Sequence, residues 1–176
     1  MSLWVALVVC LVALTALWVG QRDEKRVLPQ SLCGTRITPN DLEPLIPAEG
    51  AITERNDVDR SDPSPSSWCS LNVGGKEAVD VRFAWHSDLV DPLEIANSLN
   101  SISQLQMPER VNKAPDMVVG NDGAIATTTC RSKRGAYFTL SVLLKAGNPT
   151  DTGHRRDIEK FMRAYFPATV KTLKCG

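Results

Sequence analysis

Residues 68–86 are WCSLNVGGKEAVDVRFAWH, and they contain the strongest structural signal of the chain. Gly74 and Gly75 stand between two runs rich in apolar residues, and a glycine pair accepts the positive φ angles of a tight hairpin turn. In the second run, polar or small residues alternate with four apolar ones: Val79, Val81, Phe83 and Trp85. A period of two places one face of a strand on a core and the other in water. The stretch therefore predicts an antiparallel β-hairpin.

A helix is predicted directly after this hairpin. Residues 91–94 are Asp-Pro-Leu-Glu, a capping box with proline at the first helical position. Four apolar residues then recur at helical spacing: Ile95, Leu99, Ile102 and Leu105. We therefore expect a helix from Pro92 to about Gln106.

More strands and a closing helix are expected further along the chain. Turn residues separate a short strand at 117–119 from two longer strands at 124–131 and 136–145. The last helix is expected from about Thr152 to Leu173, because its apolar residues recur every three or four positions. Pro167 lies inside this pattern and should kink the helix near Arg163 or Ala164, since proline removes a backbone hydrogen bond.

The region before the hairpin predicts one brief helix and a long loop. Thr38-Pro39-Asn40-Asp41 offers N-cap side chains and an early proline, and Pro47 ends the helix. Residues 48–67 are polar and end in a Pro/Ser tract, which is typical of a loop. The order of elements predicts an α+β fold, in which an antiparallel sheet of about five strands carries a short N-terminal helix, a middle helix and a long C-terminal helix.

Residues 1–20 have the composition of a membrane segment. The 176-residue chain carries 20 Lys+Arg and 20 Asp+Glu, and none of these charges lies in its first 20 residues. As a helix, the apolar run at residues 3–20 would reach ~27 Å, close to the ~30 Å hydrocarbon core of a bilayer. Trp4 and Trp18 lie near its ends, and a polar run at residues 21–26 follows. We expect a single-pass transmembrane helix or signal anchor; the alternative is a cleaved signal peptide and a secreted protein.

Two signals for the orientation of this segment conflict. Arg22, Lys25 and Arg26 follow the segment, and the positive-inside tendency would place the C-terminal part in the cytoplasm. Cys10 lies within the apolar run, and the other four cysteines are Cys33, Cys69, Cys130 and Cys175. An even number of cysteines in a small domain is typical of a disulfide-bonded extracytoplasmic protein, whereas four unpaired thiols in a cytosolic domain are the alternative. We therefore predict a tether at residues 21–31 and an extracytoplasmic domain at residues 32–176.

The order of several motifs resembles a known group of proteins. The motifs are Leu32-Cys33-Gly34, Thr38-Pro39-x-Asp41-Leu42-x-x-Leu45, a Pro/Ser loop, Trp68-Cys69-Ser70-x-x-Val73-x-Gly75, a late strand with Cys130, and a helix ending in Lys174-Cys175. This order resembles actinobacterial membrane-anchored proteins and lipoproteins of unknown function, which carry a small cysteine-containing extracytoplasmic α+β domain. The resemblance covers roughly residues 32–176. It implies an envelope location and no activity, and the missing lipobox favours a transmembrane helix over a lipid anchor.

Four cysteines allow three pairings. We prefer Cys33 with Cys69, which would join the first helix to the hairpin, and Cys130 with Cys175, which would join a late strand to the chain end. The second choice pairs Cys69 with Cys130 and Cys33 with Cys175. Each closure of such a loop is expected to stabilise the domain by ~3 to 4 kcal/mol.

The sequence offers few groups for catalysis or metal binding. No cysteine pair has metal-ligand spacing, and the chain lacks the G-x-S-x-G, P-loop and dinucleotide-binding patterns. His86, with Asp88 and Asp91 nearby, could begin a metal or acid–base site, although a solvated loop commonly has this composition. We expect no catalytic residue, no metal and no cofactor. The formal net charge of zero also gives no large positive field for nucleic acid.

Basic residues in the C-terminal half form a candidate interaction patch. Its members are Arg131, Lys133, Arg134, Arg155, Arg156, Lys160 and Arg163. Such a patch would attract anionic lipid headgroups or envelope polymers. The alternative is an ordinary solvated helix face, because Asp157 and Glu159 interrupt the positive charge.

Two functions are therefore expected. The favoured one is a non-catalytic, membrane-tethered cell-envelope module, which contacts the bilayer through residues 3–20 and binds an envelope protein or an anionic envelope polymer. The alternative is a small-ligand-binding or hydrolytic extracytoplasmic domain with a pocket near Trp85 and His86.

Overall fold

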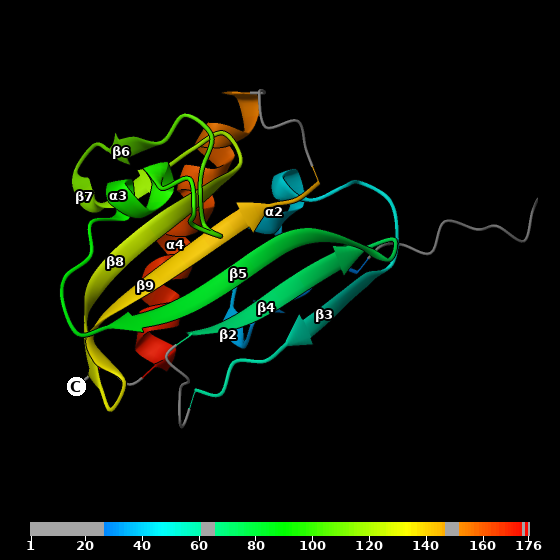
Figure 1. Cartoon of the computed structure of the whole chain (residues 1–176). Helices are drawn as coiled ribbons and strands as arrows, with labels where there is room; N and C mark the ends of the chain where they lie inside the picture. The colour runs from blue at the N-terminus through cyan, green and yellow to red at the C-terminus, as the bar shows by residue number, and fades with distance from the viewer. Residues whose placement is uncertain (1–26, 61–65, 147–151, 174, 176) are drawn as a thin grey trace, which may run out of the picture.

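Among the residues that the structure describes, seven antiparallel strands form one sheet, and the longest helix crosses one of its faces (Figure 1). The computed structural model describes residues 27–60, 66–146, 152–173 and 175. Neighbouring strands follow the order β3-β4-β5-β9-β8-β7-β6. Their bounds are β3 (Ile52–Asn56), β4 (Ser66–Val73), β5 (Lys76–His86), β6 (Glu109–Val111), β7 (Ala114–Val119), β8 (Gly123–Ser132) and β9 (Gly135–Leu144).

The remaining elements are short, except for the last helix. They are β1 (Ser31–Leu32), β2 (Thr35–Arg36), α2 (Pro39–Leu42), the 3-10 turn η1 (Glu43–Leu45), α3 (Pro92–Asn97), the 3-10 turn η2 (Thr152–His154) and α4 (Arg155–Thr172). The β1–β2 hairpin and α2 pack against α4, so they lie on the same side of the sheet as that helix (Figure 1). Helix α3 packs on β7 and β8 instead.

The hairpin predicted at residues 68–86 is present as β4 and β5. Val73 pairs with Lys76 across the turn, and Gly74 and Gly75 have φ angles of 59° and 77°. These positive angles allow the tight turn, and a side chain at either position would strain it.

The main core lies between the sheet and α4. The four alternating apolar residues of β5 are buried there, together with a helical stripe of α4: Ile158, Phe161, Met162 and Tyr165. Helix α4 continues through Pro167, whose ring lies at an exposed position. Burying each large apolar side chain contributes about 1.5 to 3 kcal/mol, so this interface is the main source of stability.

The α+β prediction with about five strands is wrong, because the protein is mostly β. Strand β3 was expected to be part of a loop. It is an edge strand in which four of five residues are exposed, so no hydrophobic alternation marks it. The short strand β6 at the opposite edge was not expected either. Edge strands bury little apolar surface, and hydrophobic periodicity therefore cannot predict them.

The middle helix ends at Asn97, far before the expected end near Gln106. Its predicted start is confirmed, since the Asp91 side chain accepts a hydrogen bond from the backbone N–H of Leu93. Residues 97–101 are Asn-Ser-Leu-Asn-Ser, and short polar side chains compete with helical hydrogen bonds. The Asn97 amide donates to the Leu93 carbonyl, and Ser98 is extended. The predicted apolar stripe is therefore interrupted after Asn97: Leu105 is buried, whereas Leu99 and Ile102 are exposed.

The expected transmembrane helix at residues 1–20 lies outside the described residues. Within the described part of the chain, no helix is both long enough and apolar enough to cross a membrane.

Candidate functional site

Two disulfides lie within the described residues, and they join the pairs that we preferred from the sequence. Cys33–Cys69 connects the β1–β2 turn to β4, with a Cα–Cα distance of 5.7 Å. Cys130–Cys175 connects β8 to the end of the chain just after α4, with a Cα–Cα distance of 4.6 Å. The prediction of disulfide bonds is confirmed, and both bonds attach peripheral segments to the central sheet.

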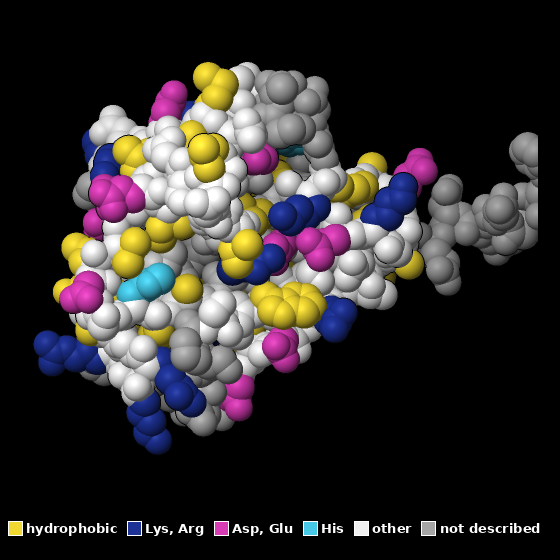
Figure 2. All heavy atoms as spheres, in the orientation of Figure 1, with side chains coloured by type: hydrophobic (Ala, Val, Ile, Leu, Met, Phe, Trp, Pro, Cys, Tyr) yellow, Lys and Arg dark blue, Asp and Glu magenta, His cyan; other side chains and the backbone are white. Residues whose placement is uncertain are grey.

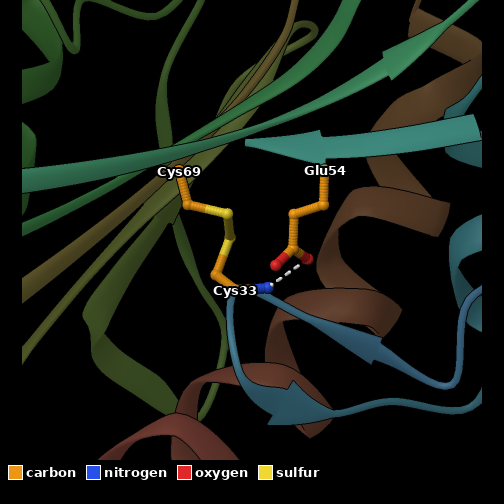
Figure 3. A group of neighbouring side chains, drawn as sticks. All are labelled: Cys33, Glu54 and Cys69. Carbon is orange, nitrogen blue, oxygen red and sulfur yellow. Dashed lines mark hydrogen bonds between the residues drawn. A yellow bond between two sulfur atoms is a disulfide. The ribbon is translucent and has the colours of Figure 1, made fainter. Parts of the chain in front are cut away.

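The Cys33–Cys69 disulfide lies beside a carboxylate, and this group has the donor types of a metal site (Figure 3). The two sulfur atoms and a Glu54 carboxylate oxygen lie within 4.8 Å of one another. The sulfurs are bonded to each other, however, so they offer no thiolate to a metal. Glu54 Oε2 instead accepts a hydrogen bond of 2.7 Å from the backbone N–H of Cys33. The group is structural in its oxidised form.

Trp85 and His86 do not share a pocket, because successive residues of a strand point to opposite faces. Trp85 is buried in the main core, with its ring 4.9 Å from that of Phe138. His86 lies on the other face; its Nε2 atom is buried and has no hydrogen-bond partner among the described residues. Burial lowers the pKa of His86 below its usual value, so the imidazole is neutral at pH 7.

The carboxylates near His86 have partners of their own. Asp88 accepts a hydrogen bond of 2.9 Å from the Ser87 hydroxyl. Asp91 caps α3 and forms a 2.5 Å ion pair with Arg110. The backbone N–H of Leu93, followed by Arg110, lowers the pKa of Asp91. These two carboxylates and His86 do not form a group with metal-ligand geometry within the described part of the chain.

A pocket of about 230 Å³ opens beyond the end of β5. It is lined by Leu89, Val90, Asp91, Pro92, Arg110, Asp116 and Thr127. Neither Trp85 nor His86 lines it, so it is not the pocket that we expected from the sequence.

The structure divides the predicted basic patch between the β8–β9 turn and the first half of α4. Arg131, Lys133 and Arg134 lie at the β8–β9 turn, where Cys130 is bonded to Cys175 next to the end of the helix. Arg155 lies at the helix start. An α-helix rises ~1.5 Å per residue, so the two ends of α4 are ~26 Å apart. Figure 2 shows basic side chains gathered at the end of the molecule where Figure 1 places the β8–β9 turn.

Three basic residues of α4 bind neighbouring elements. Arg155 forms an ion pair of 2.7 Å with Glu109 and donates a hydrogen bond to the Met107 carbonyl. Lys160 forms an ion pair of 2.7 Å with Asp41. Arg163 binds Glu159 and also donates to the Asn112 carbonyl. These cations therefore hold the helix against the rest of the fold.

The β5–β6 connection, residues 87–108, exposes several large apolar side chains. Their exposed fractions are 65% for Leu89, 84% for Leu99, 66% for Ile102 and 67% for Met107. Among the described residues, Val27 also exposes a large hydrophobic side chain. The helical spacing of Leu99 and Ile102 predicts buried positions, and this prediction is wrong because α3 ends at Asn97.

The base of this connection is well fixed. Ala96 and Leu105 are buried in a second core with residues of β7, β8 and β9: Val118, Ile125 and Leu143. The Leu105 N–H donates to the Ala96 carbonyl at 3.0 Å, and the Gln106 N–H donates to Asp122 at 2.8 Å. The exposed side chains are therefore presented from an ordered base.

Figure 2 shows the sheet face that is opposite α4, and apolar side chains reach the surface in the region of α3, β6 and β7. Charged side chains of both signs surround them.

No protein-family model matches the chain, and no curated protein or solved structure is significantly similar to it.

Proposed function

We propose that this chain is a non-catalytic, membrane-tethered module of the cell envelope, which binds another envelope protein through the β5–β6 connection. The observation that carries this proposal is the exposure of Leu89, Leu99, Ile102 and Met107 from one ordered segment. The partner would be a protein that presents apolar side chains to this surface.

These four exposed side chains contribute little hydrophobic free energy to folding, because they remain in water in the folded state. A large aliphatic side chain contributes about 1.5 to 3 kcal/mol when it moves from water into an apolar contact. Isolated exposed hydrophobic residues are common on protein surfaces, but a group within one segment is typical of an interaction site. A partner that covers Leu99 and Ile102 would supply the contact that the chain itself does not.

The position of the surface also supports binding away from the membrane. In the view of Figure 1, the first described residues lie toward the same end of the molecule as the β4–β5 turn, whereas the β5–β6 connection, which packs on β7 and β8, lies toward the opposite end. If the apolar residues 3–20 hold the chain at the bilayer, the connection would face the envelope space. The two disulfides support an oxidising, extracytoplasmic compartment, in keeping with the resemblance to actinobacterial envelope proteins.

The ligand-binding or hydrolytic alternative lacks a comparable observation at its expected site, since Trp85 and His86 lie on opposite faces of the sheet. The anionic-polymer alternative would use the β8–β9 turn with Arg131 and Lys133, both of which are exposed. These two cations lie away from the cations at the start of α4. An anionic polymer bound at the turn would therefore contact fewer positive charges than the single patch predicted from the sequence contains.

Photocrosslinking in native membranes tests the proposal. A photoreactive residue is placed at Leu99 or Ile102 of the full chain, and a matched control is placed at Thr53, which is exposed on edge strand β3. We expect discrete protein adducts from the first two positions and none from Thr53. An identical adduct pattern at all three positions, or no adduct at Leu99 and Ile102, would contradict the proposal.

A further inference from the structure

A second pocket lies on the α4 side of the molecule, between that helix and the segment that joins β2 to α2. Its volume is about 320 Å³. It is lined by Arg36, Ile37, Thr38, Asp41, Phe161, Ala164 and Tyr165. Pockets for drug-sized ligands span ~300 to 1,000 Å³, so this one fits a small organic molecule.

The two walls of the pocket are linked at several points. Tyr165 donates a hydrogen bond of 3.0 Å from its hydroxyl to the Leu32 carbonyl, and the hydroxyls of Thr35 and Thr169 are 3.1 Å apart. Farther along the helix, the Lys160–Asp41 ion pair joins α4 to α2. These links hold the β1–β2 hairpin and α2 at fixed positions on the helix. The pocket therefore exists before any ligand binds, which reduces the entropy cost of binding.

The inner wall is apolar and aromatic. Phe161 and Tyr165 are each 1% exposed, and their rings are stacked with centroids 4.9 Å apart and an interplanar angle of 24°. Ile37 and Ala164 extend this wall. Burial raises the pKa of Tyr165, so its hydroxyl stays neutral and remains a donor to Leu32. Such a wall suits a flat apolar body.

The polar side of the pocket has a surplus of positive charge. The Asp41 carboxylate is paired with Lys160, whose pKa is raised by this hydrogen bond and by the charge of Asp41. The Arg36 guanidinium has no ion-pair or hydrogen-bond partner among the described residues. The Thr38 side chain does not cap α2, although it stands at the N-cap position. Arg36 and Thr38 thus offer free donors beside an apolar wall.

We propose that this pocket binds an organic carboxylate, in which a single carboxylate is attached to a small aromatic body. The planar Arg36 guanidinium would donate to both carboxylate oxygens, because its geometry matches that group. The aromatic body would lie against Phe161 and Ala164. A free aromatic acid and the C-terminal aromatic residue of a peptide share this chemistry. This site is separate from the β5–β6 connection, so it does not depend on the proposed function.

Calorimetric titration of the full chain tests this proposal with two probes, 3-phenylpropionate as the free acid and N-acetylphenylalanine as the peptide end. We expect saturable binding of at least one probe, and the tighter probe identifies the source. Arg36→Gln should weaken binding about tenfold or more, since a charge-assisted pair is lost. Arg131→Gln, which changes an exposed arginine of β8, should leave the affinity unchanged.

Two further measurements separate a pocket from a general charge effect. Ala164→Trp should abolish binding, because the larger side chain fills the cavity. Neither 3-phenylpropanol nor inorganic phosphate should bind comparably, since each lacks half of the recognised chemistry. Absence of binding by both acids, equal binding by Arg36→Gln, or equal binding by the alcohol or by phosphate would overturn the proposal.

Discussion

The β1–β2 region and the β5–β6 connection are both attached to the central sheet, but they are stabilised in different ways. The β1–β2 region is held by the Cys33–Cys69 disulfide and by side-chain hydrogen bonds to α4. The β5–β6 connection is held by backbone hydrogen bonds and a small apolar core, and it leaves large apolar side chains in water. The first region is therefore held by covalent and polar links, whereas the second keeps an outer apolar surface that is available to a protein partner.

Arg60 links the β1–β2 hairpin to the main core and to α4. Its guanidinium lies 5.4 Å from the centroid of the Phe83 ring and donates to the Cys33 carbonyl and to the hydroxyls of Thr35 and Thr172. Burial lowers the pKa of Arg60, but the group remains charged at neutral pH. Leu99 and Ile102, in contrast, face solvent, and no comparable side-chain network surrounds them among the described residues.

The largest expected effect of a substitution is on the core that supports the β1–β2 region. Phe83 is fully buried and packs near Phe138 and Arg60. Phe83→Ala should lower the free energy of unfolding by about 3 to 5 kcal/mol, because it leaves a cavity. Chemical denaturation of the full chain measures this change. A loss below about 1 kcal/mol would show that the core collapses around the smaller side chain and is not tightly packed at Phe83.

Removal of the Cys33–Cys69 disulfide should have the next largest effect. The bond closes a loop with a sequence separation of 36 residues. Cys33→Ser with Cys69→Ser should therefore reduce the free energy of unfolding by about 3 to 4 kcal/mol. Denaturation under non-reducing conditions measures the loss. If the double variant is as stable as the parent chain, the disulfide does not secure the β1–β2 region.

The Tyr165 hydroxyl, which joins α4 to the Leu32 carbonyl of β1, should make stability depend on pH in the alkaline range. Burial raises its pKa in the folded protein above the value of about 10 in the unfolded chain. The folded state therefore keeps a proton that the unfolded state releases, and stability should fall as the pH rises above about 10. Tyr165→Phe should remove this part of the alkaline slope while costing about 1 to 3 kcal/mol at neutral pH, because the buried Leu32 carbonyl loses its donor. An unchanged alkaline slope would argue against this assignment.

The smallest effect on stability is expected in the β5–β6 connection. Leu99→Asp with Ile102→Asp should change the free energy of unfolding by no more than about 0.5 kcal/mol for each substitution, because both side chains are already exposed. Denaturation of this double variant next to the parent chain measures the difference. A loss as large as that of Phe83→Ala would mean that these residues are part of the folded core.

Sequence periodicity correctly predicted the strands and helices that bury one regular apolar face. The alternation in β5 and the stripe of α4 predicted the two sides of the main core, and the preferred cysteine pairs are those in the structure. Periodicity failed for edge strand β3, which exposes most of its residues, and beyond Asn97, where polar residues end α3. The pocket lined by Arg36 and Phe161 could not be predicted, because tertiary contacts bring together residues more than a hundred positions apart.

The central claim is that Leu99 and Ile102 contact an envelope protein rather than the rest of the chain. Its most direct test is the crosslinking yield from a photoreactive residue at Met107, compared between the parent chain and the Leu99→Asp, Ile102→Asp double variant in native membranes. Thr53→Asp, at an exposed position of β3, is the matched control. We predict that the double variant loses the Met107 adduct while Thr53→Asp retains it. An adduct of equal yield in the double variant would contradict the account.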